Sequence, residues 1–173
     1  MRKMTWSALF LSALVALGCG AGGSDDSAAS SGGSEAKDDK PAAKIGEPVR
    51  DGKFEFTVKS QKCGVSKVGT DLVGAKAQGQ FCLITVTVKN IGKEPQTLVD
   101  SAQKAYAADG TEYSTDSTAA LYANKGENTI FTEINPGNQI TGVLVFDIPK
   151  DVKLTKLELH DSIFSGGVEV ALE

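Results

Sequence analysis

The chain contains 173 residues, of which 40% are hydrophobic and 6% aromatic, and its formal net charge is −4 at pH 7. This length leaves room for one folded domain with a leader and a linker. A mildly acidic surface repels phosphate backbones, so we expect neither nucleic acid as a partner nor electrostatic docking on anionic lipid.

The first 18 residues have the order of a secretory signal peptide. Arg2 and Lys3 precede an apolar run, residues 4–18, which ends directly before Cys19. A basic start followed by an apolar run and small residues predicts export and removal of residues 1–18. An uncleaved membrane anchor is the alternative, although the run has 15 residues and a spanning helix needs about 20.

Val15-Ala16-Leu17-Gly18-Cys19 resembles the lipobox of bacterial lipoproteins, in which the cysteine thiol is acylated and becomes the mature N-terminus. The resemblance implies lipidation of Cys19, with a chain such as palmitate. It also implies attachment to the bacterial cell membrane on its extracytoplasmic side, inner or outer membrane undecided. Simple secretion with an incidental Cys19 is the competing interpretation.

The segment after Cys19 has the composition of a flexible tether. Residues 20–45 are rich in Gly, Ala, Ser and charged residues, contain no aromatic residue, and reach their first large aliphatic side chain at Ile45. Such a segment cannot bury enough apolar surface to offset its ordering entropy. We therefore divide the chain into a signal peptide (1–18), a lipidated tether (19–45) with a mean reach of about 25–30 Å, and a folded domain (46–173).

From Ile45 onward the pattern is that of β-strands. Apolar and polar residues alternate from Phe54 to Val58 and again from Phe81 to Asn90, where Cys82, Ile84, Val86 and Val88 share one face. Further strands are predicted at Thr97–Val99, Lys104–Ala107, Thr111–Ser114, Thr129–Ile134, Gln139–Ile148, Leu154–Leu159 and Val168–Leu172.

Turns and the absence of helical periodicity complete the prediction. Asp109-Gly110 and Asn135-Pro136-Gly137-Asn138 have the composition of sharp turns, and residues 64–79 read as a long glycine-rich loop. No stretch shows sustained helical periodicity, and Leu72–Ala77 has room for one helical turn at most. Seven to nine short strands predict an all-β antiparallel sandwich, with a small β-barrel as the open alternative.

Four motifs occur in a characteristic order: Thr85-Val86-Thr87-Val88-Lys89-Asn90, Ala108-Asp109-Gly110-Thr111-Glu112-Tyr113, Ile134-Asn135-Pro136-Gly137 and Val145-Phe146-Asp147-Ile148-Pro149. This order is similar to that in the bacterial lipoprotein domain of unknown function grouped with the immunoprotective extracellular, immunoglobulin-like fold, which has mycobacterial secreted antigens among its relatives. The resemblance covers residues 47–173. It implies an immunoglobulin-like β-sandwich at the cell surface, without enzymatic activity and without known ligand residues.

The remaining two cysteines, Cys63 and Cys82, are predicted to form a disulfide. Exported thiols that can pair usually become oxidised, and a bridge across about 20 residues is worth about 3 kcal/mol in the loop-entropy model. A zinc site is the alternative, but two thiols and His160, the single histidine, do not supply four ligands.

Few residues point to catalysis or to a metal. His160 is followed by Asp161 and Ser162, but neighbouring residues on a strand point to opposite faces and cannot form a proton relay. A His at a strand end is the simpler interpretation. Asp109, Glu112 and Asp116 lack the glycine-kinked spacing of a calcium loop. We expect no catalytic residues, no cofactor and no metal.

The sequence therefore favours a non-catalytic cell-surface lipoprotein that serves as a binding or interaction module of the bacterial envelope. It does not identify the ligand, for which an envelope or extracellular protein is a candidate. Loops at residues 64–79 and 120–128 are the expected binding regions, since sandwich domains recognise partners through loops and sheet edges. The alternatives are an envelope-structural or stress-accessory protein without a specific ligand and, as a third hypothesis, a hydrolase that uses His160.

Overall fold

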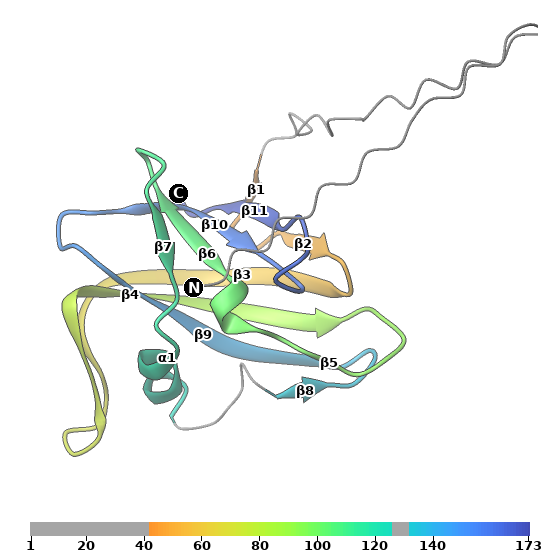
Figure 1. Cartoon of the computed structure of the whole chain (residues 1–173), viewed down its shortest axis with the longest axis horizontal. Coiled ribbons are helices and arrows are strands. Elements are labelled where there is room, and N and C mark those ends of the chain that lie inside the picture. Colours follow the sequence, from red (N-terminus) through yellow and green to blue (C-terminus); the bar gives the residue numbers. More distant parts are fainter. Residues whose placement is uncertain (1–41, 126–131) are drawn as a thin grey trace, which may run out of the picture. The chain divides into compact units, whose positions relative to one another are not determined.

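A computed structural model describes residues 42–125 and 132–173 of the chain, which belong to one compact unit, residues 39–173 (Figure 1). The unit has its own apolar core, so we expect it to fold without the 38 residues before it. Cys19, the predicted signal peptide and most of the predicted tether lie outside the described residues.

Four antiparallel strands form the first sheet, in the order β2-β3-β4-β9. They span Pro48–Asp51, Phe54–Gly69, Gly74–Asn90 and Gln139–Ile148. β9 has the bounds predicted from the sequence and pairs with β4 over its whole length, from Gln80 opposite Ile148 to Lys89 opposite Gln139. β9 and β2 are the edges of this sheet.

The second sheet has the order β1-β11-β10-β6-β7. Its strands span Ala43–Lys44, Val168–Ala171, Leu154–Leu159, Lys104–Ala107 and Glu112–Ser114. β1 pairs in parallel with β11, which extends the folded part three residues before the expected start at residue 46. A separate two-stranded ribbon joins β5 (Gln96–Thr97) to β8 (Glu133–Ile134), and a 3-10 turn, η1, covers Asp100–Ala102.

The core lies between the two sheets and confirms the predicted all-β sandwich. The even-numbered face of β4 points inward as the alternation predicts, and its residues from Cys82 to Val88 are at most 1% exposed. They pack with fully buried side chains from both sheets, among them Phe54, Phe56, Phe146, Leu157, Leu159 and Val170. The described residues contain eleven strands rather than seven to nine, because three two-residue segments add to the larger ones.

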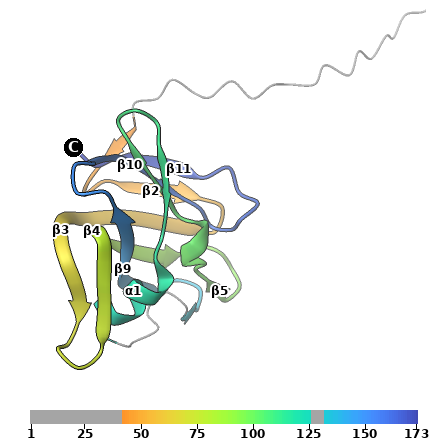
Figure 2. The same ribbon diagram turned by 60° about the vertical axis from the view of Figure 1, so that its left-hand side comes forward.

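Two sequence predictions are wrong. Residues 64–79 are not a loop but the outer half of the β3–β4 hairpin. A helix, α1, forms instead at Ser117–Ala123, where none was expected. Figures 1 and 2 show the hairpin leaving the sandwich as a curved projection, with α1 beside it.

Candidate functional site

The projection, residues 64–79, is called the arm here. In its outer part Lys67 pairs with Lys76, Val68 with Ala75 and Gly69 with Gly74. The tip, residues 70–73, is an ordered turn in which the Thr70 N–H donates to the Val73 carbonyl (2.7 Å) and the Val73 N–H donates to the Thr70 hydroxyl (3.1 Å). Gly69 permits this turn, since its φ of +96° is one that other residues rarely adopt.

The predicted disulfide stands at the base of the arm. Cys63 and Cys82 are 19 residues apart in sequence and bonded in the structure. Cys82 is fully buried, whereas Cys63 is exposed. The bridge therefore links the arm to the core and closes the hairpin at the point where it leaves the sandwich.

Asp147 fixes the direction in which the arm leaves. Its carboxylate accepts hydrogen bonds from the backbone N–H groups of Gln78 (2.6 Å) and Gly79 (3.0 Å), where the ladder between β3 and β4 is irregular. Gly79 passes so close to the Ile148 carbonyl that an added Cβ would overlap it. An irregular ladder leaves backbone donors without strand partners, and the Asp147 carboxylate supplies the missing acceptors.

We expect Asp147→Asn to loosen the arm while leaving the sandwich folded. The single amide oxygen of Asn can keep one of the two hydrogen bonds, without the charge that strengthens it, so the loss should be about 1–2 kcal/mol. Hydrogen exchange of residues 64–79 should become faster, while β10 should be unchanged. The matched control is Asp151→Asn on the exposed β9–β10 connection, which should leave the arm as it is; equal exchange in both variants would contradict the role given to Asp147.

Helix α1 lies against the edge strand β9 and is fastened there at both ends. The Asp116 carboxylate caps the helix by accepting from the Ala119 N–H (2.8 Å), while its own N–H donates to the Val145 carbonyl (2.7 Å). The Asn124 amide exchanges two hydrogen bonds with the backbone of Val143 (3.0 and 2.9 Å). The helix thereby satisfies backbone groups that an edge strand would otherwise expose.

A groove of about 440 Å³ lies between the arm, α1 and the sheet, and is called the cationic groove here. It joins the two segments that the sequence singled out, since residues 65–69 and residues 122–125 both line it. The apolar part of its lining comes mainly from Val65, Val68, Leu83, Tyr122 and Val143. Lys62, Lys67 and Lys125 also line it, and no lining residue is acidic.

The cationic groove thus departs from the acidic character of the whole chain. It combines an apolar surface with three ammonium groups, which is suited to a ligand that has both an apolar part and a negative charge. The sequence indicated the two segments, but it gave no sign that they meet. Residues 126–128 of the second expected loop lie outside the described residues.

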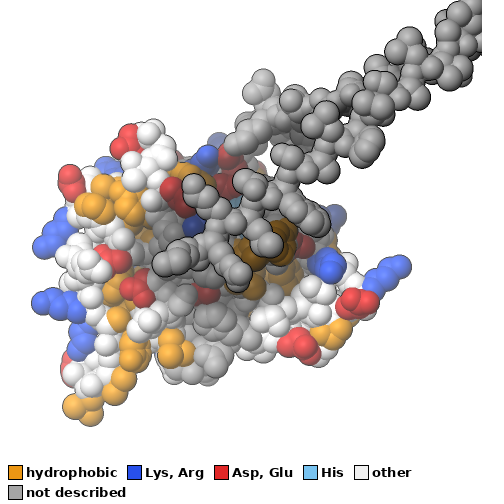
Figure 3. Space-filling view, viewed as in Figure 1, with side chains coloured by type: hydrophobic (Ala, Val, Ile, Leu, Met, Phe, Trp, Pro, Cys, Tyr) orange, Lys and Arg blue, Asp and Glu red, His pale blue; other side chains and the backbone are white. Residues whose placement is uncertain are grey.

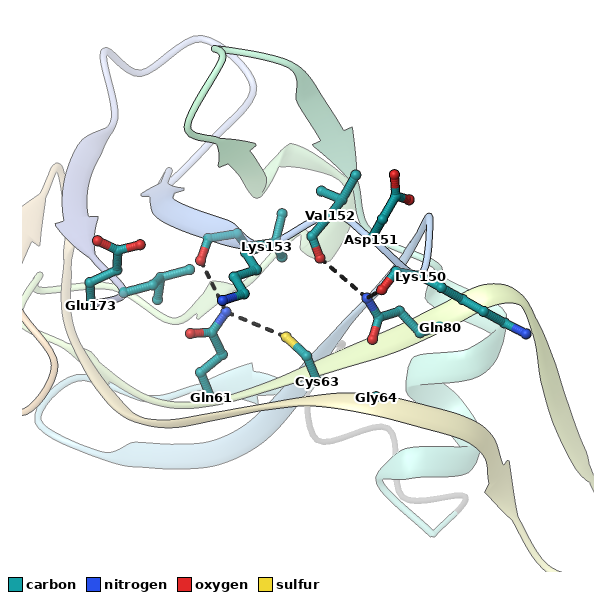
Figure 4. Close-up of a pocket in the computed structure, with 11 residues that line it drawn as sticks. Gln61, Cys63, Gly64, Gln80, Lys150, Asp151, Val152, Lys153 and Glu173 are labelled. Carbon is teal, nitrogen blue, oxygen red and sulfur yellow. Dashed lines mark hydrogen bonds between the residues drawn. The ribbon is translucent and has the colours of Figure 1, made fainter.

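A second groove, of about 490 Å³, lies on the other side of the arm base (Figure 4). Gln61 and Gln80 point into it toward the β9–β10 connection. The Gln80 amide donates to the carbonyls of Pro149 (3.0 Å), Lys150 (3.0 Å) and Val152 (3.2 Å), while the Gln61 amide donates to that of Leu154 (3.3 Å). Both side-chain amides donate to backbone carbonyls of the same protein. The groove is therefore best explained as a structural contact between the base of the arm and the segment that follows β9.

His160 follows directly on the last residue of β10, at the strand end that the sequence indicated. Its ring lies 3.3 Å from the Glu158 carboxylate on one side and 3.3 Å from the Ser165 hydroxyl on the other, a grouping that the sequence did not predict. The Ser165 hydroxyl donates to the Ser162 carbonyl (3.0 Å), and the ring sits so close to Gly167 that a Cβ there would overlap it. These contacts shape the β10–β11 loop.

The three acids considered for calcium serve separate purposes. Asp109 accepts from the Thr111 N–H (3.0 Å) in its turn, and this hydrogen bond lowers the pKa of the Asp109 carboxyl. Glu112 pairs with Lys104 (3.2 Å), while Asp116 caps α1. Within the described residues, no group of three His, Cys, Asp or Glu side chains is placed to hold a metal ion.

Tyr106 lies among carboxylates on the outer face of the second sheet. Desolvation by burial, followed by interactions with Glu158 and Glu112, raises its pKa well above the ordinary value of 10.0. Lys156 lies over its ring, with the ammonium nitrogen 4.6 Å from the ring centre.

We expect Tyr106 to lose its proton at a higher pH than an unperturbed phenol. Because the pKa is higher in the folded state than in the unfolded state, this group's contribution to stability is complete below about pH 10 and is lost as the pH rises through the folded-state value. Titration of tyrosinate absorbance should show a late component that disappears in Tyr106→Phe. A late component that persisted in this variant would contradict the assignment.

The described part of the chain contains no helix that is long and apolar enough to cross a membrane.

The chain belongs to the family defined by a domain of unknown function, DUF4352, whose model matches residues 43–170. This match confirms the resemblance drawn from the order of the four motifs. The chain is also 34% identical over 114 residues to the YxkC protein of Bacillus subtilis, in an alignment that covers 62% of this chain and 63% of that protein. It therefore spans less than two thirds of that relative.

Two solved structures show the same fold at low sequence identity. The yjhA protein of Bacillus subtilis has a TM-score of 0.58 at 17% identity, covering 76% of this chain and 99% of its own. MPT63, a secreted protein of Mycobacterium tuberculosis, has a TM-score of 0.53 at 19% identity, covering 72% and 92%. The order of the motifs and these likenesses agree on a β-sandwich domain.

Proposed function

We propose that the protein is a non-catalytic, lipid-anchored binding module of the bacterial envelope, and that the arm and the cationic groove form its binding surface. The observation that carries the proposal is the meeting of residues 65–69 and 122–125 in one groove with an apolar lining and lysines but no acidic residue. The lipobox-like Val15–Cys19 sequence supports the anchor, and the likeness to a secreted protein supports an extracytoplasmic location.

The surroundings of His160 support a non-catalytic role. A nucleophilic serine donates its proton to the neighbouring imidazole, whereas the Ser165 hydroxyl lies closer to the Ser162 carbonyl (3.0 Å), to which it donates, than to His160 Nδ1 (3.3 Å). The ring is also held against Gly167 and Glu158. If the protein were a hydrolase built on His160, His160→Ala would abolish a measurable turnover, and that result would overturn this part of the proposal.

Site-specific photo-crosslinking on intact cells tests the binding surface. A photoreactive residue at Lys62 or Lys125, on the cationic groove, should capture the same envelope component from both positions. The control position is Phe164, which is 90% exposed and lies on the β10–β11 loop. Capture from the control but not from the groove would overturn the proposed surface, and no capture at all would favour the structural alternative without a specific ligand.

A further inference from the structure

We propose that the tip of the arm docks on the surface of a bilayer containing anionic lipid, with Leu72 entering the interface and the lysines of the arm facing lipid phosphates. The inference deepens the proposed function, because it names the partner of the arm. The exposed tip, the charge along the hairpin and the predicted tether support this contact.

The tip presents apolar side chains to solvent on an ordered turn. Leu72 is 95% exposed and Val73 is 58% exposed, although hydrogen bonds between Thr70 and Val73 fix the backbone there. Figure 3 shows hydrophobic side chains at this lower left extreme of the molecule, with Lys and Arg side chains along the same edge. Because the turn is already ordered, placing Leu72 among lipid carbonyls or upper acyl segments requires little further ordering.

Charge along the hairpin has the sign that anionic lipid attracts. The arm contains two lysines, Lys67 and Lys76, and one acid, Asp71, and Lys59 and Lys62 precede it on β3, in a chain whose net charge is −4. The chain is acidic as a whole but basic in this segment. The expectation that the protein does not dock electrostatically on anionic lipid, which was drawn from the net charge, therefore does not apply to the arm. An apolar tip flanked by lysines is typical of segments that lie in a membrane interface.

One cross-strand pair of the arm places two positive charges opposite each other. Lys67 lies directly opposite Lys76, and like charges in that position destabilise a sheet. Lys67 also pairs with Asp71 at 3.5 Å, but the Asp71 side chain is fully exposed, so this ion pair contributes little. A phosphate between the two ammonium groups would relieve their repulsion, and a layer of anionic headgroups supplies many such phosphates.

The predicted tether would make even a weak contact between the arm and the membrane sufficient. A lipid on Cys19 confines the domain to within a few tens of ångström of the membrane, because a flexible segment of about 26 residues has a mean reach of about 25–30 Å. At that distance the second contact acts at a high effective concentration. One lipid chain combined with a basic surface is a known route to stable anchoring.

Vesicle co-sedimentation of residues 39–173, which lack Cys19, tests the inference. The domain should bind vesicles of about one part phosphatidylglycerol to three parts phosphatidylcholine, and should release as salt is raised. Binding to pure phosphatidylcholine should be much weaker. Lys67→Gln with Lys76→Gln should lower the partition coefficient about 25-fold, at about fivefold per lysine. Leu72→Gln should lower it about tenfold.

Each variant has a matched control at the opposite end of the sandwich. Phe164→Gln replaces an equally exposed apolar residue, and Lys53→Gln with Lys93→Gln removes two exposed lysines. Both controls should bind as the parent does. The lysine variant of the arm should also be at least as stable as the parent, because it removes a repulsion, so weaker binding cannot be ascribed to unfolding.

The inference is overturned if the parent does not bind phosphatidylglycerol vesicles, or binds pure phosphatidylcholine equally well. It is also overturned if the controls lose binding as much as the arm variants do. Inorganic phosphate and glycerol phosphate should compete only weakly; full competition would assign a small soluble anion rather than a membrane. If the domain does not bind vesicles but an envelope protein is captured from Lys62 and Lys125, the proposed binding surface is supported and only the membrane contact is overturned.

Discussion

Removing the disulfide by Cys63→Ala with Cys82→Ala is expected to lower the free energy of unfolding by about 3 kcal/mol, the value that loop-closure entropy gives for a bridge of this span. For a domain of this size the corresponding fall in Tm is about 10 °C. The loss should be concentrated in the arm, because the bridge joins the two strands where the hairpin leaves the core. Hydrogen exchange of residues 64–79 should accelerate more than that of β10.

Reduction of the parent protein separates the bridge from the packing of its sulfur atoms. Cys82 is fully buried, so the alanine variant also loses sulfur contacts in the core, whereas reduction breaks only the S–S bond. Thermal melts with and without a phosphine reductant should differ for the parent and coincide for the double variant. Coincident melts for the parent would show that the hairpin ladder alone holds the base of the arm.

The strands that the sequence predicts well are those whose pattern has a single physical interpretation. β6, β9 and β10 have the predicted bounds, because their apolar or alternating runs end at a turn or at Pro149. Asp109-Gly110 and Asn135–Asn138 are turns for the same local reason, with Gly110 and Gly137 at positive φ. The local sequence is enough to predict a strand end or a turn where the residues that determine it are close in sequence.

The sequence predicts a loop where the arm forms, because glycine has two structural uses that a local pattern does not distinguish. Gly69 and Gly74 face each other across the last pair of the hairpin, where an added Cβ would overlap the opposite backbone, and Gly79 lets β4 pass the Ile148 carbonyl. These glycines permit close approach within a ladder, whereas a glycine-rich segment read alone predicts a loop. The partner strand that makes the difference is not visible in the local pattern.

Helix α1 and the cationic groove escaped prediction for a different reason. The helix has seven residues and buries only Ala119 and Ala120, which is too short for a helical period to appear. Its available signal was Asp116, a good N-cap residue directly before Ser117. The groove depends on Asn124 bonding to Val143, 19 residues away, and no local pattern contains that contact.

Asn90→Ala is expected to cost about 3 kcal/mol, because the side chain is fully buried and three backbone groups lose its hydrogen bonds. The Asn90 amide donates to the carbonyls of Glu94 (2.7 Å) and Ile134 (2.7 Å), and its oxygen accepts from the Gly92 N–H (2.8 Å). It therefore joins the end of β4 to the following turn and to β8. The sequence places Asn90 at the end of a predicted strand, and its side chain links that strand end to a strand distant in sequence.

Chemical unfolding of Asn90→Ala, Asn90→Asp and Asn138→Ala measures this role. The Asn138 side chain is exposed, and its backbone carbonyl accepts from the Asn90 N–H, so Asn138→Ala should be neutral to within about 0.5 kcal/mol. Asn90→Asp keeps the acceptor for Gly92 but points a carboxylate oxygen at two carbonyls, so it should be worse than alanine at neutral pH. Burial and those carbonyls raise the pKa of the introduced carboxyl, so Asn90→Asp should regain stability relative to the parent as the pH falls and the group becomes a donor. A variant whose stability relative to the parent did not change with pH would show that the carboxylate had turned to solvent, and that the backbone bonds of Asn90 alone hold the end of β4.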